Sequence, residues 1–336
     1  MKILLLKDTL SWRLLSGKLR RNFVPLPSST SLLHSHATSF GFKEVSEEQK
    51  SQMVGHVFDS VASKYDLMND IMSAGLHRLW KDRLASKLNP FPGIKHIDMA
   101  GGTGQTRLCR NPVKPLDVHS LENLVKDTFN NPLSSLVDSQ LAGDVAFRIL
   151  DAINRIKSWP MHQLHDDLLE EAQIYVCDIN PNMLDVGKKR AMERGFGEDK
   201  SLLWLEEDAE ALHFGDISMD SYTIACGIRN VTHMEKALAE AYRVLNLGGR
   251  FLCLELTRME IPVIKELYDF YSFTVVPAVG KLVTGDRDSY QYLVESIGSF
   301  PPQETFASML AEAGFKKVEF ENLLGGVVAI HSGLEL

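Results

Sequence analysis

Five short apolar runs alternate with helical segments along this chain, and that alternation restricts its fold more than any other feature. The runs are "IKHIDMA" (94–100), "QIYVCDIN" (173–180), "SLLWLEEDAEAL" (201–212), "SYTIACGIRN" (221–230) and "GRFLCLEL" (249–256). Helical patterns occupy 182–195 and 233–249, and two glycines are expected to end the second helix. Since parallel strands are joined by crossover helices, the sequence predicts a mostly parallel sheet with helices on both faces.

The two ends of the folded part depart from this pattern. Residues 41–93 read as an N-terminal helical cap, in which Ser46 is expected to cap a helix whose first turn holds Glu47 and Glu48. Near the C-terminus, "KKVEFENLLGGVVAIHS" (316–332) predicts two strands joined by a Gly-Gly turn, and hence a closing antiparallel hairpin. Residues 94–334 are therefore expected to form one domain behind the cap.

Composition narrows the location and the partners. The first 40 residues hold six basic residues and one acidic residue, with apolar residues at helical spacing, which is typical of a transit peptide; a disordered tail is the alternative interpretation. The net charge of -8, without a concentrated basic face, argues against nucleic-acid binding. No apolar run reaches 18 residues, so any membrane contact is expected to be peripheral. The four cysteines form no CxxC pair, and we expect free thiols rather than disulfides or a metal site.

Candidate ligand-binding residues follow three successive strands. They are Gly101, Gly102, Thr103 and Gly104 after the first strand, Asp178 after the second, and Asp208 and Ala209 after the third. Glycines let a ligand approach the backbone, and carboxylates can accept hydrogen bonds from ribose hydroxyls and an adenine amino group. Together these residues predict an adenosine pocket. Taken singly, the glycine turn is also consistent with helix packing, Asp178 with a helix cap and Asp208 with a solvated charge.

Several longer strings make the chain resemble the class I S-adenosylmethionine-dependent methyltransferases, and within them the quinone-biosynthesis C-methyltransferases. The strings include "HVFDSVASKYDLMNDIMSAGLHRLWK" (56–81), "DMAGGTG", "DINPNML", "DAEAL" and "GIRNVTHMEKALAEAYRVL", and the likeness covers most of residues 41–334. The resemblance implies a Rossmann-like seven-stranded sheet with S-adenosylmethionine as cofactor. It also implies that Thr103, Asp178, Asp208 and Ala209 contact that cofactor.

For function, the resemblance implies C-methylation of a polyprenylated methoxy-benzoquinol, a step of ubiquinone (coenzyme Q) biosynthesis. It further implies a mitochondrial matrix enzyme, peripheral on the inner membrane, in a multisubunit complex with other coenzyme Q biosynthesis proteins; a homodimer stays open. Two alternatives are a catalytically weak or inactive scaffold in that complex and a demethylmenaquinone/phylloquinone-type methyltransferase. A nicotinamide-dependent oxidoreductase is disfavoured, because the turn lacks the GxGxxG spacing that binds a pyrophosphate.

Three residues are candidates for the catalytic step. A ring carbon becomes nucleophilic when its phenol ionises, so the site needs a base or a cation. Arg229 and Asn230 directly follow the fourth strand, where the methyl group is expected, and Tyr65 on the cap is placed to close over it. A structural ion pair is the alternative interpretation for Arg229, and ordinary packing for Tyr65. No single residue is identified as the base.

An aromatic and valine-rich segment, "IKELYDFYSFTVVPAVGKLV" (264–283), suits the prenyl tail of such a substrate. It is expected to line a channel or to face a membrane, and a plain core helix explains it equally well.

The glycine turn is followed by a segment that breaks the pattern. In the family the turn continues as "GGTGDVAFRIL", and here that continuation stands at 143–150 in "GDVAFRIL". Residues 105–143 are therefore interpreted as an insert, which is polar and broken by prolines. Separating the turn from its helix is expected to weaken cofactor binding unless the insert loops out and leaves Gly104 close to Asp144. Because loop closure costs little extra with length, we expect the fold to stay intact.

Overall fold

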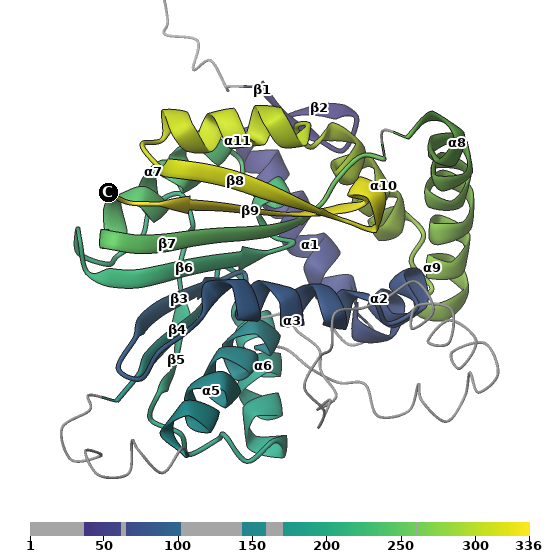
Figure 1. The fold of residues 1–336 in the computed structure, drawn as a ribbon. Helices are drawn as coiled ribbons and strands as arrows, with labels where there is room; N and C mark the ends of the chain where they lie inside the picture. Colours follow the sequence, from purple (N-terminus) through teal and green to yellow (C-terminus); the bar gives the residue numbers. More distant parts are fainter. Residues whose placement is uncertain (1–36, 62–64, 102–142, 159–170, 260) are drawn as a thin grey trace, which may run out of the picture. The chain divides into compact units, whose positions relative to one another are not determined.

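The computed structural model describes residues 37–61, 65–101, 143–158, 171–259 and 261–336. The first 36 residues and nearly all of the predicted insert lie outside this part of the chain. The described residues are organised around a seven-stranded sheet with the order β5-β4-β3-β6-β7-β9-β8 (Figure 1).

The sheet confirms the predicted fold class. Its strands are β3 (Lys95–Met99), β4 (Gln173–Asp178), β5 (Leu202–Glu206), β6 (Met219–Ala225), β7 (Leu245–Leu256), β8 (Lys316–Leu323) and β9 (Val328–Leu334). The first five pair in parallel, whereas β9 pairs antiparallel with both β7 and β8. Between β8 and β9, Gly325 and Gly326 have φ angles of 68° and 98°, which is the left-handed region that the predicted Gly-Gly turn requires.

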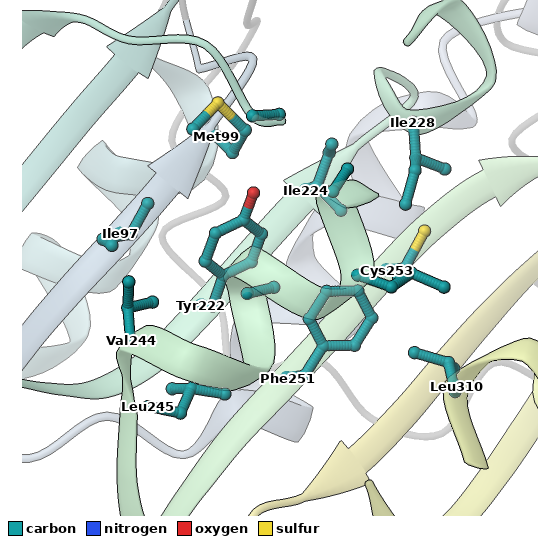
Figure 2. Close-up of a cluster of buried hydrophobic side chains, with 14 of the residues drawn as sticks. Ile97, Met99, Tyr222, Ile224, Ile228, Val244, Leu245, Phe251, Cys253 and Leu310 are labelled. Atoms are coloured by element: carbon teal, nitrogen blue, oxygen red, sulfur yellow. The ribbon is translucent and has the colours of Figure 1, made fainter. Parts of the chain in front are cut away.

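Helices cover both faces of the sheet, because the central strands are apolar on both sides. The helices packed on the sheet are α3 (His77–Leu88), α5 (Asp144–Lys157), α6 (Pro181–Glu193), α7 (Met234–Val244) and α11 (Gln303–Glu312). Phe251 points into the cluster under α7 and α11, where Figure 2 shows it near Leu310. Its neighbour Leu252 belongs to the cluster under α3 and α5. The two cores therefore lie on opposite faces.

One predicted boundary is wrong. Helix α7 ends at Val244 and β7 begins at Leu245, so the two glycines expected to end the helix lie within the strand segment. Leu245 is fully buried and pairs with Met219 of β6, so the strand begins here and the helix ends before the two glycines.

The N-terminal cap begins with a hairpin rather than a helix. β1 (Ala37–Phe40) pairs antiparallel with β2 (Lys43–Ser46), and α1 (Glu47–Val61) and α2 (Tyr65–Ser73) follow. Residues 37–40, which the sequence had assigned to the leader, are thus part of the fold. The expected cap of α1 is confirmed: the Ser46 hydroxyl accepts from the Gln49 amide at 3.3 Å, and the Gln49 side chain accepts from the Ser46 amide at 3.2 Å.

The aromatic segment forms α8 (Pro262–Phe270), a π-helical turn at Tyr271–Val275 and α9 (Val276–Thr284), and α10 (Asp288–Ser299) follows. Figure 1 shows α8 and α9 standing together at one side of the sheet. None of the described helices has the length and apolar character needed to cross a bilayer.

The thiols that the structure describes are free, as expected. Cys177 and Cys253 are buried in strands and Cys226 is half-buried. Cys109 lies outside the described residues.

Candidate active site

The carboxyl ends of β5, β4, β3 and β6 lie side by side at one edge of the sheet. Backbone hydrogen bonds join the segments that follow them: the Glu207 amide donates to the Asp178 carbonyl at 3.1 Å, and the Gly101 amide donates to the Cys177 carbonyl at 3.0 Å. The structure therefore brings together Gly101, Asp178, Asp208 and Ala209 as the sequence predicts, whereas Gly102, Thr103 and Gly104 lie outside the described residues.

Gly101 is a glycine because the protein itself leaves no room for a side chain. A Cβ there would lie 2.8 Å from the Asp98 carbonyl oxygen and 2.8 Å from Cγ1 of Val176. The packing interpretation of the turn thus holds for this glycine. The preceding Ala100 has a φ of 55°, a strained value for a residue with a side chain, and such strain often marks functional sites.

The Asp178 carboxylate is buried at the end of β4, with 8% of the residue exposed. Its Oδ1 accepts from the Asn180 amide at 2.9 Å, which fixes its direction. Asp178 is not the cap of α6, because the Asn180 side chain accepts from the Asn182 amide at 2.9 Å and fills that role. The helix-cap interpretation of Asp178 is therefore wrong.

Asp208 and Ala209 lie beyond β5 in different environments. Asp208 is exposed and its Oδ1 accepts from the Glu210 amide at 2.9 Å. Ala209 is buried and packs in the cluster under α7. This pair presents a carboxylate beside a small apolar residue, a combination that suits the edge and face of an aromatic base.

A cavity of about 150 Å³ lies beside this edge. It is lined by Arg229 and Asn230, by Ala225 and Cys226 from the end of β6, by His77 and Lys81 from α3, and by Tyr268, Tyr271, Tyr290 and Tyr292. The two catalytic candidates that follow β6 therefore share one cavity. Tyr65 is the first residue of α2, and its side chain lies outside the described part of the chain.

Arg229 is held in a buried ion pair. Its Nη1 lies 2.5 Å from Oε1 of Glu255 and also donates to the Cys226 carbonyl at 2.7 Å. The two side chains are 4% and 0% exposed. Arg229 thus forms the structural ion pair that the sequence left open and lines the cavity as well. Glu255, inside the β7 run, was missed because its apolar neighbours give no sign of a buried partner.

Asn230 is oriented by a tyrosine. The Tyr292 hydroxyl donates to Oδ1 of Asn230 at 3.0 Å, and the Tyr292 ring stacks on Phe40 of β1 with the centroids 4.0 Å apart. Burial raises the pKa of Tyr292 to about 12, so its hydroxyl keeps its proton. Nδ2 of Asn230 is buried without a hydrogen-bond partner among the residues that the structure describes, and is left to serve as a donor.

Two pairs of polar side chains lie on the α3 side of the cavity. His77 Nε2 lies 3.0 Å from Oδ1 of Asp70, and Lys81 Nζ lies 3.2 Å from Oδ2 of Asp144. Neither His77 nor Lys81 was identified from the sequence, although both lie in "GLHRLWK", at the end of the segment 56–81 that resembles the family. The carboxyl group of Asp98, on β3, accepts hydrogen bonds from the Thr223 hydroxyl and the Ala146 amide. Burial raises the pKa of this carboxyl group to about 7.

Known proteins match this chain over most of its length. A model of the ubiE/COQ5 methyltransferase family matches residues 43–114 and 121–335, and the break falls inside the predicted insert. A relative from Oryza sativa subsp. japonica is 60% identical over 324 residues, covering 96% of this chain and 97% of its own. One from Arabidopsis thaliana is 58% identical, with shares of 96% and 99%, and one from Homo sapiens is 46% identical over 299 residues, with shares of 89% and 84%. All three are named "2-methoxy-6-polyprenyl-1,4-benzoquinol methylase, mitochondrial".

Proposed function

The chain belongs to the ubiE/COQ5 methyltransferase family, and from that premise we propose that it methylates a ring carbon of a polyprenylated methoxy-benzoquinol in ubiquinone biosynthesis. The observation that carries this proposal is 60% identity to a methylase of that name over nearly the full length of both chains. The names of the relatives do not favour an inactive scaffold or a phylloquinone-type enzyme.

The residues at the sheet edge fit S-adenosylmethionine. Asp178 offers a fixed carboxylate at the end of β4, and Asp208 with Ala209 offers a second carboxylate beside a small residue. We assign the ribose hydroxyls to Asp178 and the adenine to Asp208 and Ala209, and we keep residues 101–104 as candidate contacts for the rest of the cofactor. When bound, S-adenosylmethionine supplies the methyl group on a sulfonium, which is already a good leaving group.

Arg229 and Asn230 are proposed to hold the quinol oxygen as negative charge develops on it. The Glu255 carboxylate balances the charge of Arg229, so the stabilisation comes from directed N-H donors in a buried site rather than from net charge. Asn230 supplies its Nδ2 donor, because Tyr292 occupies the acceptor end of the amide. Tyr65 stays a proposed contact from the cap, closing the cavity against water.

The prenyl tail is proposed to reach the cavity past α8 and α9. Tyr271 and Val276 line the cavity, while the outer side of the same segment exposes Leu267 (70%), Phe270 (61%) and Leu282 (85%). Since a polyprenyl substrate resides in a bilayer, we assign this exposed apolar face to the inner-membrane surface, on the matrix side. This arrangement lets the substrate head enter the protein while the tail stays in lipid.

Vesicle binding tests the assignment of that face. The double variant Leu267→Asp/Phe270→Asp should lose most of its co-sedimentation with vesicles of inner-membrane lipid composition. Leu247→Asp is the matched control, since Leu247 is 76% exposed in β7, away from α8 and α9. Equal retention of both variants by the vesicles would place the lipid contact elsewhere.

The reaction itself is tested with a short-chain quinol that lacks the ring methyl group. The purified protein should methylate its ring carbon and should bind S-adenosylhomocysteine in calorimetry. Binding without methylation of any quinol would support a scaffold, and the absence of binding would overturn the assignment of the cofactor.

Co-purification with other coenzyme Q biosynthesis proteins would support the proposed complex, and light scattering of the pure protein would show whether it is a homodimer.

A further inference from the structure

His77 combines three features that ordinary packing does not require. It lines the same cavity as Arg229 and Asn230, and its side chain is only 9% exposed. Its Nε2 lies 3.0 Å from Oδ1 of Asp70, whose Oδ2 accepts from Arg78 at 2.5 Å. Its Nδ1 is buried and has no hydrogen-bond partner within the described ranges.

These contacts determine where the proton of the imidazole lies. An ionised Asp70 can only accept, so Nε2 of His77 carries the hydrogen and Nδ1 keeps its lone pair. A buried acceptor without a donor is energetically unfavourable, which favours a ligand that brings a donor. A phenolic hydroxyl is such a donor.

We propose that His77 is the general base that removes the phenolic proton of the quinol, and that Asp70 is the positioning residue that holds its imidazole. This inference rests on the proposed function and names the base that the sequence left unassigned.

The other titratable side chains of the cavity are less suited to this role. Arg229 is held in an ion pair with Glu255, and Lys81 is held in an ion pair with Asp144. Burial raises the pKa of the Cys226 thiol to about 11 and raises the pKa of the Tyr292 hydroxyl as well. Neither is ionised near neutral pH.

His77 is neutral where the others are charged or protonated. Burial lowers its pKa below the usual 6.5, and the hydrogen bond to Asp70 opposes that shift without cancelling it. The charged groups around the imidazole are Asp70 and Arg78 on one side and Lys81 and Asp144 on the other, and Asp144 also pairs with Arg148 at 3.1 Å. The imidazole is therefore free to accept a proton at pH 7 and poorly suited to hold it for long.

The step balances as follows. The phenolic O-H bond breaks and its proton moves to Nδ1 of His77, while the ring carbon forms a bond to the methyl group and the sulfur keeps the electron pair of the broken C-S bond. The ring carbon then loses its own hydrogen as a proton, which restores the aromatic ring. One of the two protons returns to the phenolate oxygen, so one proton is released for each methyl transferred.

The central variant is His77→Gln, whose amide can still donate to Asp70 but cannot act as a base. Its kcat should fall by about 100-fold or more, the usual contribution of a general base, while the Kd for S-adenosylhomocysteine stays within about twofold. The loss should shrink with a more acidic phenol, such as a halogenated quinol, because that substrate ionises in solution. The wild-type rate should decline as the pH falls through the lowered pKa of His77, and the variant should lack that decline.

The matched control is His331→Gln. His331 is also a buried histidine whose Nδ1 has no partner among the described residues, but it lies on β9 and is not part of the cavity lining. Its variant should lose thermal stability and keep kcat. Asp70→Asn should lower kcat less than His77→Gln and should shift the pH profile, since it changes the orientation and basicity of the imidazole.

A second readout does not depend on turnover. In protein labelled with ¹⁵N-histidine, the His77 resonances, assigned by their loss in His77→Gln, should show the Nε2-H tautomer and should shift at Nδ1 when a quinol analogue binds. An Nδ1-H tautomer, or an equal loss of kcat with both acidic and ordinary phenols, would overturn the assignment of the base. A wild-type protein that methylates no quinol would instead overturn the proposed function.

Discussion

The Gly143 amide donates to the Gly101 carbonyl at 2.8 Å, although residues 102–142 stand between them in the chain. The two sides of the predicted insert are thus joined at the sheet edge. On the far side, Asp144 pairs with Lys81 and the Ala146 amide donates to Asp98 at 3.1 Å, so α5 is held in place by contacts beyond the break. The expectation that the insert leaves the fold intact agrees with these bonds, whereas its effect on cofactor binding stays a prediction.

Deletion of residues 105–143 should strengthen cofactor binding. It leaves Gly104 directly before Asp144, so that the turn and the start of α5 again form one short segment next to the cofactor. We expect the affinity for S-adenosylhomocysteine to rise by about tenfold or more in calorimetry, with turnover rising alongside. The control replaces 105–142 with a Gly-Ser linker of equal length. Unchanged affinity in the deletion variant would show that the insert does not harm the site.

The N-terminal hairpin should be needed for activity. Phe40 stacks on Tyr292, and Tyr292 orients Asn230, so a chain that starts after residue 40 lacks a support of the cavity wall. A protein beginning at residue 35 should be active, and one beginning at residue 41 should lose most of its turnover. Phe40→Leu keeps an apolar side chain without the ring and should lose about 1 kcal/mol of stability.

Residues 1–36 fused to a fluorescent protein should direct it to mitochondria, and the mature N-terminus found by sequencing should precede residue 37.

Much of the fold was predictable because parallel strands are read from local patterns. The five apolar runs became β3 to β7, and the Gly-Gly turn became the C-terminal hairpin. The hairpin at 37–46 was missed because its short strands, ATSF and KEVS, have no clear alternation and are specified by contacts far along the chain. The same limit applies to the site: Asp178 could be placed from its strand end, whereas Glu255 and His77 acquire their partners only in three dimensions.

Stability should depend on pH through Asp98. Its pKa is raised from 3.8 to about 7 by burial, so between those values the folded state binds a proton that the unfolded state has released. The contribution of Asp98 to the free energy of unfolding is therefore fully present below pH 4. It is lost as the pH rises towards 7, and the loss from this one group is at most about 4 kcal/mol. Chemical denaturation of the wild type and of Asp98→Asn measures the difference. The difference in free energy of unfolding between the wild type and Asp98→Asn should change by a few kcal/mol from pH 4 to pH 7, at the expense of the wild type. A difference that does not depend on pH would contradict the raised pKa.

The pair formed by Arg229 and Glu255 calls for a conservative substitution. Arg229→Ala would leave a fully buried carboxylate without its partner, at a cost of about 3 to 5 kcal/mol, and loss of folding would then hide any effect on chemistry. Arg229→Lys keeps the charge but loses the planar set of donors, and we expect turnover to fall by about 100-fold with cofactor affinity nearly intact. A variant with lower thermal stability and normal kcat would show that the ion pair is only structural.

Asp178 should contribute directly to cofactor affinity. Its carboxylate is buried, fixed by the Asn180 amide and not used as the cap of α6, and this position at the end of β4 fits the proposed recognition of the ribose. Asp178→Ala should weaken S-adenosylhomocysteine binding by about 1.5 to 3 kcal/mol, or roughly tenfold to more than a hundredfold in calorimetry. Asn180→Ala is the matched control, because it removes the true helix cap two residues away and should cost about 1 kcal/mol of stability. If Asp178→Ala lowers the melting temperature as Asn180→Ala does, and both bind the ligand with wild-type affinity, Asp178 shapes the loop and does not hold the ribose.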